Sequence, residues 1–277
     1  MDVRFSTDPQ SLKTKTTQEL RSLFLMTTLF EPDAVPMVYS DIDRSITGSA
    51  VPVKGPLTLL SSKKEMAAEY FTERREVGVI NIGGAGTIVV DGVSFALGKN
   101  DALYIGRESK LVVFHSAAAD EPAAFYFVSY PAHTVYPTTL IKEADAQHVA
   151  LGSTNDANKR TINKYILPGG VKSCQLVMGL TTLEAGSVWN TMPVHTHQRR
   201  SEVYMYFNLP DNAVVFHLMG EPSETRHIVL RNRQAVLSPS WSIHSGVATQ
   251  NYSFIWAMGG ENQVFNDMDG VDLAKFK

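Results

Sequence analysis

The chain has 277 residues, of which 44% are hydrophobic and 19% are charged. This balance is typical of a globular protein and excludes a disordered or collagen-like chain. The 25 basic and 28 acidic residues are spread along the sequence and give a net charge of -3. Because no basic stripe is present to bind a phosphate backbone, we expect no nucleic-acid partner.

The N-terminal segment and the cysteine content indicate the cellular location of the protein. The first twenty residues are polar and charged, without the apolar core of a signal peptide. No stretch approaches the roughly 18 apolar residues of a membrane span, so we expect no membrane partner. The single cysteine, Cys174, excludes an intramolecular disulfide and is expected to be a small buried hydrophobic residue. Together these features predict a cytoplasmic protein.

The best helical pattern lies within the first 30 residues. Leu20, Leu23 and Phe24 have helical spacing and follow Thr17, a candidate N-terminal cap. Strand patterns dominate the rest of the chain, so an all-β fold with a few short helices is predicted.

Short β-branched runs alternate with turn residues from Val77 onward. GVINI, GTIVV and VSFAL are separated by Gly83-Gly84 and Asp91-Gly92, which predicts consecutive hairpins. The GGAG stretch at 83–86 lacks the Gly-Lys-Ser/Thr ending of a phosphate-binding loop, and no helix pattern follows it. We therefore interpret GGAG as a turn.

The alternation fades over residues 131–160, which end in the polar segment GSTNDANKR. This composition is typical of a linker, and it places a domain boundary near residue 150. Domains are therefore predicted over 1–150 and 151–277. Strands are predicted again in the second half, at SEVYMYFN, AVVFHLMG, TRHIVL, AVLSPSW and YSFIWAM.

The two halves resemble each other locally. ERREV at 73–77 aligns with RRSEV at 199–203, and LGKNDALYIG at 97–106 aligns with LRNRQAVLSP at 230–239. We infer an internal duplication of one β-barrel unit.

Four residues of the second half have the chemistry and spacing of metal ligands. In an extended strand, His195 and His197 project from one face about 7 Å apart. A turn could bring Glu202 back to the same point, and His244 could complete the set. A lone histidine in a strand is more often packed or exposed than a ligand, but four ligand-type residues beside strands favour a metal site. Zn²⁺, Fe²⁺, Mn²⁺, Ni²⁺ and Co²⁺ all suit these ligands.

The segments around these residues resemble the two metal-binding motifs of the cupin superfamily. GSVWNTMPVHTHQRRSE keeps the His-His-Glu spacing of the first motif, and SPSWSIHSG keeps the Pro-to-His spacing of the second. Gly186 lies farther upstream than the usual glycine, Pro210 stands near the usual closing glycine, and Trp241 replaces a glycine. The resemblance implies a bicupin, with two double-stranded β-helix (jelly-roll) barrels.

Within that superfamily, nearly the whole chain is similar to the 5-keto-4-deoxyuronate isomerase family. The matching segments are MVYSDIDR, ERREVGVINIGGAGTI, RTINKYI, WNTMPVHTH, SPSWSIHSGV and GENQVFNDMD. The resemblance implies one zinc ion per subunit, a homohexamer and a role in degrading pectin-derived uronates. It also implies an aldose-ketose isomerisation of 4-deoxy-L-threo-5-hexosulose uronate to 3-deoxy-D-glycero-2,5-hexodiulosonate.

Several further residues are candidates for this chemistry. Strand alternation places Tyr204 and Tyr206 on the same face as Glu202, and these three are candidate catalytic residues. Lys164 is a further candidate. Other titratable residues near matched segments are His217 and Glu261. The substrate carboxylate could bind Arg160, Arg199, Arg200 or Arg226, and Trp189, Trp241 or Trp256 could form a pocket wall.

The first half lacks the complete ligand set. Glu76 aligns with Glu202, but no histidine precedes it, and Leu111 aligns with His244. We therefore expect a structural role for the first barrel, with Glu76 in a surface ion pair with Arg74 or Arg75. Two alternatives to the isomerase are an Fe(II)-dependent cupin dioxygenase and a non-enzymatic sugar-binding bicupin.

Overall fold

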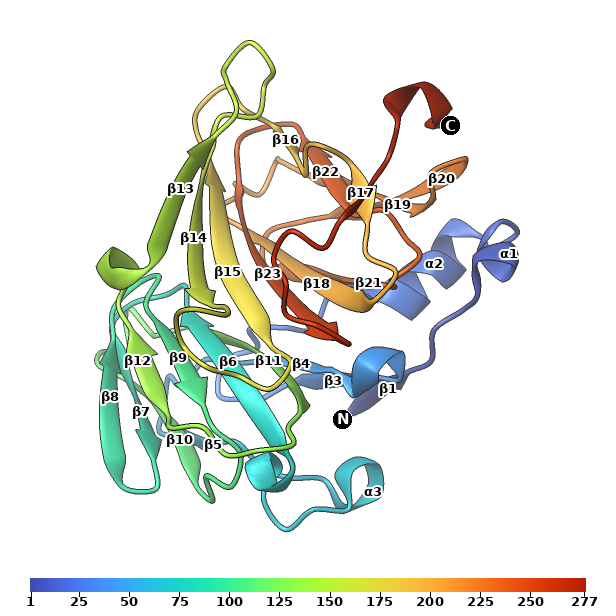
Figure 1. Ribbon diagram of the computed structural model, residues 1–277. Coiled ribbons are helices and arrows are strands. Elements are labelled where there is room, and N and C mark those ends of the chain that lie inside the picture. The colour runs from blue at the N-terminus through green and yellow to red at the C-terminus, as the bar shows by residue number, and fades with distance from the viewer. The chain divides into compact units, whose positions relative to one another are not determined.

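Strands dominate the computed structural model, which describes residues 1–277 (Figure 1). The chain divides into two compact units. The first comprises Met1–Val3, Thr28–Ala146 and Tyr165–Val177, and the second comprises Arg4–Thr27, Gln147–Lys164 and Met178–Lys277. Most of the N-terminal segment therefore belongs to the second unit, whereas the sequence suggested a single boundary near residue 150. That boundary stays a prediction.

The first unit contains a seven-stranded and a four-stranded sheet. The larger sheet has the order β1 (Asp2–Arg4), β3 (Met37–Ser40), β4 (Ile46–Ala50), β11 (Phe125–Pro131), β6 (Arg75–Asn81), β9 (Ala102–Ile105) and β12 (Thr139–Ile141). The smaller sheet has the order β5 (Leu57–Thr58), β10 (Val112–Ser116), β7 (Gly86–Val90) and β8 (Val93–Leu97).

The second unit repeats this plan and adds a short strand pair. Its larger sheet has the order β13 (Gln147–Leu151), β14 (Arg160–Ile166), β15 (Val177–Leu183), β23 (Ser253–Gly260), β18 (Arg200–Phe207), β21 (Gln234–Ser238) and β2 (Leu25–Met26). Its smaller sheet has the order β16 (Trp189–Asn190), β22 (Ser245–Ala248), β19 (Val215–Glu221) and β20 (Glu224–Leu230), and β17 (His195–Thr196) pairs with β24 (Asp269–Gly270).

The helices are short. They are α1 (Pro9–Leu12), α2 (Thr17–Phe24) and α3 (Lys63–Met66), with 3-10 turns at Ile42–Arg44, Phe71–Glu73, Glu143–Asp145 and Leu273–Lys275. None has the length and apolar character needed to cross a membrane.

Helix α2 begins at Thr17, the residue that was predicted to be its cap. Thr16, rather than Thr17, caps it, and Thr16 and Glu19 each bind the other's backbone N–H in a capping box. Leu20 and Phe24 are buried, and in Figure 1 the helix lies beside strands β20 and β21. The Arg21 guanidinium donates a 2.9 Å bond to the Val229 carbonyl.

One of the two predicted hairpins forms. Strands β7 and β8 pair across Asp91-Gly92, where both residues have a positive φ, as a tight hairpin turn requires. The prediction of a hairpin at Gly83-Gly84 is wrong, because β6 and β7 lie in different sheets. In a barrel made of two sheets, the chain must pass from one sheet to the other. Two successive strands have the same sequence pattern whether they pair with each other or lie in different sheets.

The polar segment GSTNDANKR is also not a linker. Strands β13 and β14 pair antiparallel from Gln147 opposite Lys164 to Leu151 opposite Arg160, so residues 152–159 form a hairpin loop. The five strands predicted in the second half are all present, as β18, β19, β20, β21 and β23.

Aromatic side chains fill the core of the first unit. Phe114 lies 5.3 Å from Phe125 and 6.2 Å from Phe127 between ring centroids, and Phe71 packs edge-on against Phe127. A close-packed apolar interior leaves no polar space for an ion. The barrel that could hold a metal is therefore in the second unit.

Candidate metal centre and active site

Three separate segments of the second unit bring four ligand-type side chains to one point. Glu202 lies on β18, which is bonded on both sides, to Met258 of β23 and to Ser238 of β21. His195 is held by β17, which pairs with β24, and His244 directly precedes β22. The backbone of a doubly paired strand has little freedom to move, so the position of Glu202 in the site is firmly fixed.

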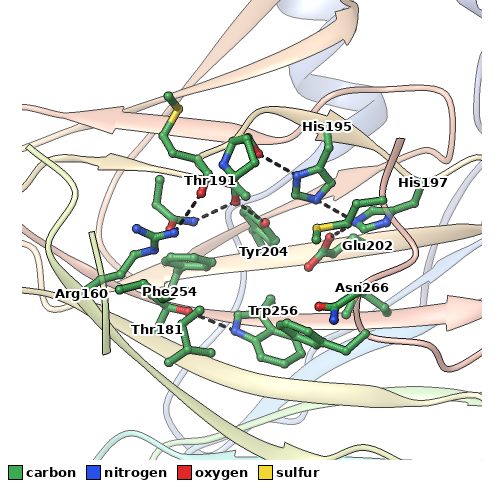
Figure 2. Close-up of a pocket in the computed structure, with 18 residues that line it drawn as sticks. Arg160, Thr181, Thr191, His195, His197, Glu202, Tyr204, Phe254, Trp256 and Asn266 are labelled. Carbon is green, nitrogen blue, oxygen red and sulfur yellow. Dashed lines mark hydrogen bonds and ion pairs between the residues drawn. The ribbon is translucent and has the colours of Figure 1, made fainter. Parts of the chain in front are cut away.

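The four donor atoms lie close together, and Figure 2 shows His195, His197 and Glu202 at one side of the pocket. His195 Nε2 is 3.2 Å from both His197 Nε2 and His244 Nε2. Glu202 Oε2 is 3.2 Å from His197 Nε2 and 3.1 Å from His244 Nε2. All four side chains are buried, with 2 to 5% of their surface exposed.

Backbone carbonyls fix which ring nitrogen of each histidine faces inward. His195 Nδ1 lies 2.9 Å from the Pro193 carbonyl and His197 Nδ1 lies 2.8 Å from the Asp267 carbonyl, while His244 Nδ1 lies 3.4 Å from the carbonyl of Ser242. A carbonyl only accepts, so a hydrogen on each Nδ1 would satisfy these contacts and leave each Nε2 with a lone pair that faces inward. Burial lowers the pKa of His195 and His244, which keeps both rings neutral.

This arrangement fits a divalent metal ion. Ligand bonds of roughly 2.0 to 2.1 Å put neighbouring donor atoms about 2.8 to 3.4 Å apart across octahedral and tetrahedral geometries, and the distances here lie within this range. Lone pairs that face one another at 3.2 Å repel unless a cation lies between them. The buried histidines His195, His197 and His244 could therefore bind a metal.

A pocket opens beside these donor atoms and leaves about 720 Å³ free of protein atoms, part of it open solvent. His195, His197 and Glu202 lie toward one side in Figure 2 and Arg160 toward the other. The rings of Phe254 and Trp256 lie along the wall between them.

The structure brings Tyr204 to this pocket but not Tyr206. Tyr204 is hydrogen-bonded to Thr191 through its hydroxyl at 2.7 Å, and burial raises the pKa of Tyr204 well above its ordinary value. It therefore stays a neutral phenol that can donate a hydrogen bond. Tyr206 lies outside the pocket wall, where its hydroxyl is 2.8 Å from Nδ1 of His217. Burial lowers the pKa of His217 to about 3.

Lys164 and Glu261 also lie outside the pocket wall. The Lys164 ammonium sits 3.8 Å from the ring centroid of Phe265, in a cation-π contact. Glu261 is exposed to solvent. Of the tryptophans, only Trp256 lines the pocket, where its indole N–H donates to Thr181 at 3.1 Å.

The four candidate arginines have different surroundings. Arg199 forms ion pairs with Asp267 and Asp269, and Arg200 donates to three backbone carbonyls between residues 264 and 267. Arg226 donates to carbonyls of residues 12–15. Only Arg160 lines the pocket.

The C-terminal segment has a role at the site that no residue pattern indicated. Residues 264–270 supply Phe265, Asn266 and Met268 to the pocket and the Asp267 carbonyl to His197. The segment GENQVFNDMD contributed to the family resemblance, but its residues carried no ligand-type pattern. Its position depends on the Arg199 and Arg200 contacts, which join residues more than sixty positions apart.

Glu76 of the first unit is not in a surface ion pair, which corrects the expectation from sequence. Its buried carboxylate accepts hydrogen bonds from the backbone N–H groups of Cys174, Gln175 and Leu176 at 2.6 to 2.8 Å, and from the Tyr104 hydroxyl at 2.9 Å. Arg74 pairs with Glu73, and Arg75 donates to Ser129. Cys174, which was expected to be buried, is only partly buried, and Leu111, which aligns with His244, is exposed. Backbone donors leave no pattern in a sequence, so these hydrogen bonds to Glu76 could not be predicted.

Replacing Glu76 by alanine is expected to lower the free energy of unfolding by about 3 to 5 kcal/mol, because three backbone N–H groups and one buried hydroxyl lose their acceptor. Urea unfolding at neutral pH measures this loss. Glu69→Ala is the matched control, since the Glu69 side chain forms an exposed contact with Lys63 and its removal should cost less than about 1 kcal/mol. Equal midpoints for the two variants would contradict the structural role of Glu76.

The fold and the site together define a two-barrel cupin protein with a buried three-histidine group in one barrel. A family model described as the KduI/IolB family matches residues 34–273. The chain belongs to this family, and its enzyme class is that of a ketol-isomerase, an intramolecular oxidoreductase.

Full-length relatives support this membership. The chain is 57% identical over 273 residues to a 4-deoxy-L-threo-5-hexosulose-uronate ketol-isomerase of Lachnoclostridium phytofermentans, with 99% of each chain covered. It is 54% identical over 279 residues to the protein of the same name from Caldicellulosiruptor bescii, with 100% of each covered. The resemblance inferred from the sequence motifs is confirmed, as is the prediction of an enzyme.

Solved structures show the same fold at low sequence identity. An IolB-like protein of Salmonella typhimurium superposes with a TM-score of 0.71 at 14% identity, covering 90% of this chain and 96% of that one. A variant of Bacillus subtilis oxalate decarboxylase gives a TM-score of 0.55 at 12% identity, covering 79% and 70%. The predicted all-β bicupin fold is confirmed.

Proposed function

We propose that this enzyme converts 4-deoxy-L-threo-5-hexosulose uronate to 3-deoxy-D-glycero-2,5-hexodiulosonate, with one zinc ion held by His195, His197, Glu202 and His244. The observation that carries the proposal is the convergence of these four donors beside a pocket that His195, His197 and Glu202 line. The names of the full-length relatives supply the substrate class.

The reaction moves a carbonyl from C1 to C2. The C2–H bond breaks, a C1–H bond forms, and the hydroxyl proton passes from the C2 oxygen to the C1 oxygen, so no oxidant or reductant is consumed. Bound zinc would supply a Lewis acid for the two substrate oxygens. The protein must supply a group that carries the proton between the carbons.

Glu202 is our candidate for the proton carrier. It is the only Asp or Glu on the pocket wall, and only its Oε2 contacts the histidine Nε2 atoms. The second carboxylate oxygen can then take the proton from C2 and return it to C1. Tyr204 cannot serve as a base while its hydroxyl stays protonated, but it can hydrogen-bond a substrate oxygen. Tyr206 and Lys164 do not line the pocket wall, so neither touches the substrate in this proposal.

The remaining wall favours this chemistry. Phe254, Trp256, Met258 and Phe265 give the pocket an apolar lining. Exclusion of water strengthens electrostatic interactions with the developing oxyanion and protects the reactive intermediate.

We further propose a homohexamer that acts in the cytoplasm, in the degradation of pectin-derived uronates. The family resemblance of the motifs supports the hexamer, and the uronate in the relatives' names supports the metabolic role. A monomer in analytical ultracentrifugation would contradict the hexamer.

The proposed activity is tested by incubating the protein with 4-deoxy-5-hexosulose uronate in deuterated water without oxygen. NMR is expected to show the diulosonate with deuterium at C1, because a carboxylate carrier exchanges its proton with solvent. A lack of conversion would overturn the proposed function, as would conversion that depends on oxygen. Conversion with no deuterium would overturn only the role of Glu202, since a direct hydride shift exchanges nothing.

A further inference from the structure

Arg160 is a buried cation on the pocket wall that no carboxylate neutralises. Its side chain begins strand β14 and is 5% exposed. Its Nη1 donates to the Asn158 carbonyl and its Nη2 to the Met192 carbonyl, each at 2.9 Å. Its Nε–H is buried and has no hydrogen-bond partner.

A buried charge is costly unless an opposite charge or hydrogen bonds compensate it. Burial lowers the pKa of the Arg160 guanidinium, but arginine remains charged in proteins. Arg199, which is partly exposed, has the carboxylates of Asp267 and Asp269 beside it. No such partner faces Arg160, so its position is suited to an anionic ligand that enters through the pocket.

We propose that Arg160 binds the carboxylate of the substrate and thereby selects uronates over neutral aldoses. This inference rests on the proposed function and names the residue that recognises the acid group. The two backbone carbonyls hold the guanidinium in place, and a carboxylate in the pocket would accept from guanidinium N–H groups that these carbonyls leave unpaired. Charge-assisted hydrogen bonds of this kind are short and directional.

The layout of the pocket matches the polarity of the substrate. In Figure 2, Arg160 is separated from His197 and Glu202 by the rings of Phe254 and Trp256. The open-chain uronate has its aldehyde at C1, its carboxylate at C6 and a methylene at C4. When C6 lies at Arg160, the reacting carbons C1 and C2 point toward the histidines and the methylene passes over apolar rings.

The test compares Arg160→Gln and Arg160→Lys with Arg226→Gln. Arg226 is the matched control because it also donates to backbone carbonyls of the second unit but lies outside the pocket. For the uronate, Arg160→Gln is expected to raise KM about 10- to 100-fold with a smaller change in kcat and an unchanged metal content. Arg160→Lys should fall between this variant and the wild type, and Arg226→Gln should match the wild type.

A second measurement separates carboxylate binding from a structural role. Gluconate, an open-chain sugar acid, is expected to inhibit the wild type more strongly than glucitol, its neutral counterpart. Arg160→Gln should remove this preference, and added guanidinium should partly restore the KM of Arg160→Ala. A structural role would weaken both inhibitors equally and would not respond to guanidinium.

The inference is overturned if Arg160→Gln keeps the wild-type KM for the uronate or keeps the preference for gluconate. Failure of the proposed function is recognised separately, because the wild type itself would then leave the uronate unchanged.

Discussion

Replacing His195 by alanine is expected to remove the metal ion and to lower turnover of the uronate by roughly 10³-fold or more. His195 Nε2 contacts the Nε2 atoms of both other histidines, so its loss opens the centre of the group. Metal analysis of the wild type should give about one zinc per chain, and the variant should contain almost none. Circular dichroism should show that the variant keeps its strands, because other side chains on β18 and its neighbouring strands form the core of the barrel.

His227→Ala is the matched control for this experiment. His227 lies in the same unit, on strand β20, but its side chain is exposed and takes no part in the histidine group. It should keep both metal and turnover. A metal-free His195→Ala protein with normal turnover would refute a metal-dependent reaction, and iron in the wild type together with oxygen uptake would favour the dioxygenase.

Replacing Glu202 by glutamine is expected to lower kcat about 10²- to 10⁴-fold, the usual contribution of a general acid or base. The amide oxygen can still approach the metal, so metal content should fall less than in His195→Ala. Glutamine cannot accept the C2 proton, so deuterium exchange at C2 of the bound substrate should slow by the same factor as turnover. Both rates can be followed in one NMR experiment.

Glu261→Gln is the control for this substitution, because Glu261 is exposed and lies outside the pocket wall. Its kcat should stay within about twofold of the wild type. A Glu202→Gln enzyme with full metal content and near-normal kcat would show that another group moves the proton.

The glutamates Glu76 and Glu202 show how one barrel plan supports two outcomes. Both are buried on the fifth strand of a seven-stranded sheet, β6 in the first unit and β18 in the second. Backbone N–H groups surround Glu76, whereas imidazole nitrogens face Glu202. A carboxylate that is saturated by backbone donors is a structural anchor, and one that faces lone pairs is suited to share a cation with them.

The sequence by itself determined the strand content, the bicupin class and the residues that converge at the site. Strand periodicity and turn residues are local signals, so the five strands of the second half and the Asp91-Gly92 hairpin could be predicted from short windows. His195, His197, Glu202 and His244 were recognisable because ligand chemistry restricts the residue types at fixed spacings.

Only the tertiary structure decided how distant segments complete that site. It placed Arg160 on the pocket wall and Lys164 outside it, although both lie on β14. It also assigned the helical N-terminal segment to the second unit and brought the Asp267 carbonyl to His197. These outcomes depend on backbone carbonyls and N–H groups that every residue carries, and on contacts between residues far apart in the chain. No residue pattern records them.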